Sequence, residues 1–136
     1  MPPLSAWMVR VALMELGVGF TLGAYMLSAK GIPFDPLYRL ALAPHIELLL
    51  FGWTLQLAVG VAAWILPRFE QPPKYGRIRL AWAGFALLNL GLALVIAGGL
   101  MGGPAHPLAL AGRVSEAAAV VLFAVFLWPR VKPFMG

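Results

Sequence analysis

The residues whose chemistry stands out in this chain are two histidines, His45 and His106. A neutral imidazole nitrogen is a common ligand of metal ions and of haem iron, so both histidines are candidate metal ligands and cofactor-binding residues. Cysteine is absent, which excludes thiolate ligands, iron–sulfur clusters and covalently attached c-type haem. The structural alternative is an interfacial hydrogen bond for His45 and a plain loop position for His106.

His45 heads a stripe of residues on one face of an expected helix. It follows Pro44, and proline is favoured at the first position of a helix. At about 100° per residue, Gly52 and Gln56 share the face of His45, whereas Glu47 points away from it. We therefore interpret His45, Gly52 and Gln56 as positions that a cofactor could contact.

His106 lies between two prolines, Pro104 and Pro107. This position predicts that it lies just outside the last apolar helix or caps it. It gains interest because we expect it on the same side of the membrane as His45.

A few polar residues interrupt the apolar segments. They are Glu15, Arg113 and Glu116, with Gln56 and Asn89 as neutral companions. Ionisable groups at such positions are costly in lipid and usually face the interior of a helix bundle. Arg113 and Glu116 are three residues apart, so they can pair across one helical turn. They serve either as polar contacts within the bundle or as functional groups, in which case Arg113 and Arg39 would neutralise haem propionates.

The composition predicts an integral membrane protein. The chain has 136 residues, of which 62% are hydrophobic and 11% charged, so we expect one domain over 1–136. The net charge is +5, but the basic residues lie at the ends of apolar segments, which argues against nucleic-acid binding. No nucleophile–base arrangement, phosphate-binding loop or glycosidase-type carboxylate pair is present, which argues against a self-contained hydrolase.

Four apolar segments predict four transmembrane helices, at 7–29, 44–66, 78–101 and 107–128. Each has about 22 residues, the length that crosses a hydrocarbon core of ~30 Å. The linkers are short and contain glycine and proline, so neighbouring helices must run antiparallel. The predicted fold is an all-α, four-helix antiparallel bundle.

The distribution of lysine and arginine predicts the orientation. The N-terminal end, the second linker and the C-terminal tail carry Arg10, Arg68, Lys74, Arg77, Arg79, Arg130 and Lys132. The other two linkers carry only Lys30 and Arg39. Because positive residues favour the cytoplasmic side, both termini should lie inside, in a multi-pass protein of the inner (plasma) membrane. His45 and His106 would then both lie at outer helix ends.

Glycines recur at helical spacing in two of the expected helices. Gly19 and Gly23 form a GxxxG pair, and Gly84, Gly91 and Gly98 repeat every seven residues. Such rows allow two helices to approach closely, either within the bundle or in a homodimer. The alternative interpretation is that a cofactor contacts a glycine face. Besides the bilayer, we expect the partner to be a second copy or a larger membrane complex.

The segment His45–Arg68 resembles the second transmembrane helix of subunit I of haem-copper oxidases and of their nitric oxide reductase relatives. The matching residues are the leading histidine, Phe51-Gly52-Trp53 and Trp64-Ile65-Leu66-Pro67-Arg68. The whole chain is similar to a small four-helix membrane protein at the edge of that superfamily. The resemblance implies that His45 ligates haem b, with a second ligand from His106 or from another copy. Two histidines cannot supply the full oxidase set, so this chain alone is not an oxygen-reducing oxidase.

Three functions follow from these features. The first is a small b-type haem protein that transfers electrons or binds a diatomic gas. The second is a cofactor-free structural or accessory subunit whose polar residues hold the bundle together. The third is a small oligomeric transporter that uses Glu15, Arg113 and Glu116 as a polar path.

Overall fold

The computed structural model describes residues 1–31 and 36–131, and every regular element within these ranges is a helix. Lys132 and Pro33 lie outside the described residues. In chain order the elements are α1 (Pro3–Gly31), η1 (Pro36–Ala41), α2 (Leu42–Glu47), η2 (Leu48–Leu55), α3 (Gln56–Ile65), α4 (Ile78–Gly102), α5 (Pro107–Leu127) and η3 (Trp128–Arg130).

Four stretches within the described residues are long and apolar enough to cross a membrane. They are Pro3–Gly31, Tyr38–Ile65, Ile78–Gly102 and Pro107–Arg130. Large apolar side chains such as Phe20, Leu27 and Val114 are between 62% and 73% exposed on the outside of the molecule. An outer surface of this kind is costly in water and is favourable against lipid. The four predicted apolar helices are thus confirmed as helices, and they suggest a multi-pass membrane protein.

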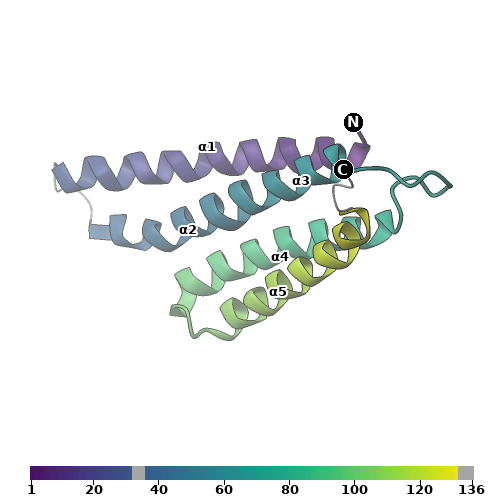
Figure 1. Cartoon of the computed structure of the whole chain (residues 1–136). Coiled ribbons are helices and arrows are strands. Elements are labelled where there is room, and N and C mark those ends of the chain that lie inside the picture. Colours follow the sequence, from purple (N-terminus) through teal and green to yellow (C-terminus); the bar gives the residue numbers. More distant parts are fainter. Residues whose placement is uncertain (32–35, 132–136) are drawn as a thin grey trace.

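The helices form two hairpins (Figure 1). The second long helix, which runs from η1 to α3, packs along α1, and α5 packs along α4. The hairpins converge at the end where α1 begins and diverge toward the other end. A shared core fills the convergent end, with side chains from both hairpins that include Met8, Ala63, Leu88 and Phe123. Consecutive helices run antiparallel, as their short linkers predict.

The second long helix changes its winding in the middle. Over η2 (Leu48–Leu55) the backbone forms a π-helix, in which hydrogen bonds reach five residues back. The hydroxyl of Thr54 donates to the carbonyl of Leu49 at 2.7 Å, across the same five-residue interval. Such wide turns are rare and frequently mark functional sites. Apolar periodicity alone predicts an ordinary α-helix here.

The glycine row of α4 faces α5 of the same chain. A Cβ atom built on Gly91 would lie 2.8 Å from Cγ of Glu116 and 2.9 Å from the carbonyl oxygen of Gly112. A Cβ on Gly84 would likewise lie 2.8 Å from the ring of Phe123. The row therefore serves close packing inside the second hairpin, as the bundle interpretation predicts.

Arg130 has a structural role that its sequence position does not predict. Its side chain is buried, and it donates hydrogen bonds to the carbonyls of Ala63, Leu66 and Pro67 at 2.7–3.1 Å. These carbonyls lie at the C-terminal end of α3, where a helix lacks internal donors. Arg130 therefore caps the first hairpin from the end of the last helix, in addition to contributing a positive charge.

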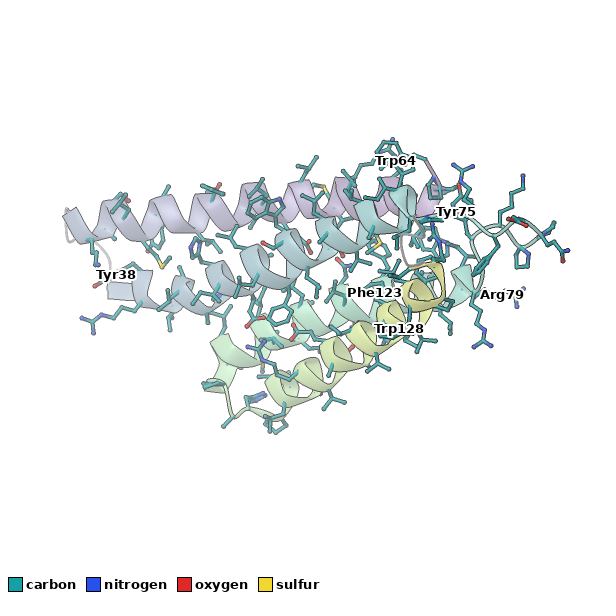
Figure 2. All side chains as sticks on the ribbon, viewed as in Figure 1. Tyr38, Trp64, Tyr75, Arg79, Phe123 and Trp128 are labelled. Atoms are coloured by element: carbon teal, nitrogen blue, oxygen red, sulfur yellow. The ribbon has the colours of Figure 1, made fainter. Side chains whose placement is uncertain are left out.

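The two ends of the molecule differ in composition. Figure 2 shows Trp64, Tyr75, Arg79 and Trp128 at the convergent end and Tyr38 at the opposite end. Aromatic rings with nearby arginines are typical of a membrane–water boundary. The convergent end is also where the sequence predicts the cytoplasmic side.

Candidate functional site

His45 is held against α1 by a hydrogen bond and by a glycine. Nδ1 of His45 lies 2.7 Å from the carbonyl oxygen of Gly19. Because a carbonyl only accepts hydrogen bonds, Nδ1 is the donor, and the other nitrogen of the neutral ring, Nε2, presents a lone pair. The ring lies over Gly23, where an added Cβ would come within 2.8 Å of Cε1.

The GxxxG pair of α1 therefore accommodates the second long helix in two ways. Gly23 makes room for the imidazole of His45, and Gly19 both accepts its hydrogen bond and faces the side chain of Leu49. The sequence predicts that these glycines allow close packing. It does not show that the group they accommodate is the histidine.

A groove opens beside His45, between the end of α1 and the start of the second long helix. It has a cavity volume of about 490 Å³ and is lined by Met26, Leu27, Lys30, Tyr38, Arg39 and Leu42. We call it the α1–α2 groove. Leu42 precedes His45 by three residues, so the imidazole lies about one helical turn from the groove. The walls are mainly apolar, and the two basic side chains, Lys30 and Arg39, supply positive charge.

Arg39, a predicted propionate partner, is exposed in this groove. Its guanidinium lies 5.9 Å from the centre of the Tyr38 ring. No carboxylate among the described residues forms an ion pair with Arg39 or with Lys30.

Gly52 and Gln56 face Glu15 of α1. A Cβ on Gly52 would lie 2.8 Å from the carboxyl of Glu15. The buried amide of Gln56 donates to Glu15 at 3.0 Å and accepts from Asn89 at 2.7 Å, while Asn89 also donates to the carbonyl of Phe85 at 2.8 Å. This hydrogen-bonded chain links α1, α3 and α4. All three stripe residues thus contact α1, as their shared face predicts, but two of them contact a carboxyl group there.

Arg113 forms the main polar contact between the hairpins. It pairs with Glu116 at 3.1 Å, which confirms the predicted i,i+3 pair. It also binds Glu47 of α2 through both terminal nitrogens, with an Nη1–Oε2 distance of 2.9 Å. The pairing of Glu47 with Arg113 is not predicted from the sequence. A carboxylate at a buried position of an apolar helix was itself a signal that a cation lies opposite.

His106 caps α5, as its place between two prolines predicts. The backbone N–H of Leu108 donates to Nδ1 of His106 at 3.3 Å, and the ring packs over Gly102. The neutral ring then carries its hydrogen on Nε2. Metal ligation through that nitrogen would require this cap to break. His106 belongs to the second hairpin and His45 to the first.

The residues around the α1–α2 groove fit one end of a haem better than a bare metal ion. The described residues contain no group of three or more histidine, cysteine or acidic side chains that could hold a metal ion. The groove offers apolar walls and two cations, and His45, whose Nε2 carries a lone pair, lies about one helical turn from its lining residue Leu42. Among the predicted cofactor-binding residues, Arg39 lines the groove, and His45 lies three residues along the helix from its lining residue Leu42. Gly52, Gln56, Arg113 and His106 have other partners inside the chain.

Comparisons with protein-family models, with curated proteins and with solved structures found no match to this chain. The resemblance of His45–Arg68 to a helix of the haem-copper oxidase superfamily therefore stays a prediction.

Proposed function

We propose that the chain is a small membrane protein of the inner (plasma) membrane that binds haem b, with Nε2 of His45 as an axial ligand to the iron. The observation that carries the proposal is the hydrogen bond from Nδ1 of His45 to the carbonyl of Gly19. Histidines that bind metals commonly donate their second ring N–H to a carbonyl or a carboxylate, which fixes the tautomer and the ring orientation. The contact with Gly19 orients His45 in this manner.

The α1–α2 groove supports the proposal by its size and its charge. A porphyrin has a flat apolar body and two carboxylates at one edge. The apolar side chains Met26, Leu27 and Leu42 suit the body, and the cations Lys30 and Arg39 suit the carboxylates. These cations line the groove and are exposed, so they can neutralise the propionates without being buried themselves.

Of the two histidines, only His45 keeps a ring nitrogen whose lone pair has no partner among the described residues. With His45 as the one protein ligand, bound haem would supply an iron centre suited to a diatomic gas such as nitric oxide. His106 is engaged as a helix cap, so a six-coordinate electron carrier would need a rearranged cap or a histidine from a second copy. We therefore favour gas binding over electron transfer.

The optical spectrum of the purified protein tests this proposal. After expression with adequate haem, the wild-type protein should show a Soret band that shifts when carbon monoxide or nitric oxide is added. His45→Ala should lose the band, and the matched variant His106→Ala should retain it. A colourless wild-type protein, or an unchanged band in His45→Ala, would sink the haem proposal.

A cofactor-free structural or accessory subunit is the second candidate. The observation that favours it is the internal pairing of the polar residues: Arg113 with Glu47 and Glu116, and Gln56 with Glu15. These contacts tie the helices together without any cofactor. In that case the protein would be colourless, and replacement of Arg113 would lower its stability without altering any spectrum.

A further inference from the structure

The contact between Glu47, Arg113 and Glu116 joins the two hairpins and contains more acids than bases. We call these three residues the carboxylate–arginine cluster. Both carboxylates are almost fully buried, with 5% of Glu47 and 3% of Glu116 exposed. If all three groups were ionised, two negative charges would face one positive charge, and the cluster would carry a net charge of −1. An unpaired charge away from water is strongly unfavourable.

The two carboxylates are not equivalent. Glu47 accepts hydrogen bonds on both oxygens from the two terminal nitrogens of Arg113. This bidentate arrangement is typical of an ionised carboxylate. Glu116 accepts one bond on Oε2, and its Oε1 is buried and has no hydrogen-bond partner among the described residues.

The elements around the cluster supply no second cation. On α4, Gly91 packs against the stem of Glu116, and the only ionisable residue of that helix, Arg79, lies in its first turn at the convergent end. The segment η2 has no ionisable residue, and its Phe51 ring lies 5.8 Å from the guanidinium of Arg113.

Other titratable groups of these elements are directed elsewhere. On α1, Glu15 bonds to Gln56, Arg10 lies over the ring of Trp7, and Lys30 lines the α1–α2 groove. His45 on α2 bonds to Gly19 of α1. His106 caps the start of α5. The excess negative charge of the cluster therefore has no compensating group among the described residues.

We infer that the carboxylate–arginine cluster is a proton-binding site, in which Glu116 holds one proton on Oε1 while Glu47 and Arg113 stay ionised. Binding converts the Glu116 carboxylate and one proton from solution into the neutral acid, which brings the cluster to zero net charge. An uncharged hydroxyl without a partner costs far less than a buried charge without one. The side chain of Arg113 is 48% exposed, so the cluster reaches the surface of the molecule through this residue. No part of this inference uses haem.

Infrared difference spectroscopy can test the proton directly. The full-length protein is purified in an ester-free detergent at neutral pH, and the carbonyl stretch of protonated carboxylic acids is compared between variants. Glu116→Gln should lose one carboxylic-acid band per chain relative to the wild type. The matched control Glu70→Gln, at an exposed loop position, should lose none. The contribution of Glu15 is common to all samples and cancels in the difference.

Two further variants keep the inference testable if Glu116→Gln does not fold. Glu47→Gln leaves one acid and one arginine, so Glu116 should ionise and the same band should be lost. Arg113→Gln leaves two acids without a cation, so both should be protonated and the contribution of the cluster to the band should double. If both carboxylates are ionised in the wild type instead, Glu116→Gln and Glu47→Gln should leave the band unchanged. An unchanged band in Glu116→Gln and in Glu47→Gln would overturn the inference.

Discussion

The orientation of His45 depends on glycines in a different helix. Gly19 supplies the carbonyl that accepts the hydrogen bond of Nδ1, and Gly23 supplies the space for the ring. A side chain at Gly23 would push the imidazole away, because its first carbon would come within 2.8 Å of Cε1. The direction of the lone pair on Nε2 is thus fixed by contacts with α1 and not by the helix that carries the histidine.

Gly23→Ala tests this dependence. The added methyl group should displace the His45 ring and weaken the proposed haem binding about 10- to 100-fold, the usual effect of losing the group that orients a metal ligand. Haem titration followed by absorbance measures the change. Gly17→Ala is the matched control, because nothing lies within 4 Å of a Cβ at that position. Equal affinities in the two variants would show that the position of the ring does not matter.

At the scale of elements, the two hairpins are held by different means. In the second hairpin, backbones approach closely along the glycine row of α4, which packs against α5. Between the hairpins, polar pairs span the gap: Gln56 bonds to Asn89, and Glu47 bonds to Arg113. Substitutions of the α4 glycines should therefore affect the stability of the second hairpin, whereas substitutions of the polar pairs should affect the contact between the two hairpins.

Gly91→Ala should destabilise the second hairpin. The added Cβ would meet the backbone carbonyl of Gly112 at 2.9 Å, and backbone cannot move aside cheaply, so we expect a loss of about 1–3 kcal/mol. Gly99→Ala on the same helix meets nothing within 4 Å and should gain up to about 1 kcal/mol from helix propensity. Detergent-micelle unfolding followed by circular dichroism gives both values. A Gly91→Ala protein as stable as Gly99→Ala would contradict the packing described here.

The sequence predicts the helices well because the signals are local. Apolar runs of membrane length and short linkers with proline and glycine define four helices and their antiparallel order, and the His106 cap follows from its two flanking prolines. Contacts between helices that are distant in the sequence are harder to predict, because no local pattern shows which faces meet. Helical periodicity places Glu47 on the face opposite His45, but only the packing of the hairpins brings Arg113 to that face. The π-helix of η2 also leaves no periodic signal in a run of leucines.

At the scale of the whole molecule, the convergent end concentrates the basic and aromatic residues (Figure 2). Arg68 and Arg130 both lie near the ring of Tyr75, at 5.2 and 5.6 Å from its centre. Positive charge at this end and little at the other predicts that it faces the cytoplasm. The α1–α2 groove, at the opposite end, would then open toward the outer face.

Cysteine labelling can determine this topology, because the chain has no cysteine of its own. Ala105→Cys lies in the loop before α5, and Gln71→Cys lies in the loop between α3 and α4; both positions are exposed. A membrane-impermeant thiol reagent added to intact cells should label Ala105→Cys and should label Gln71→Cys only after permeabilisation. The reverse pattern would mean that the groove opens toward the cytoplasm.

Arg130 makes assembly depend on the order of synthesis. The last residues of α3 leave the ribosome more than sixty positions before the arginine that bonds their carbonyls. Until then, the carbonyls of Ala63 and Leu66 must rely on water or lipid headgroups. These carbonyls therefore gain their donor last, when the second hairpin is already made. A stop codon ahead of position 130 would leave all four long helices encoded but the end of the second long helix without its cap.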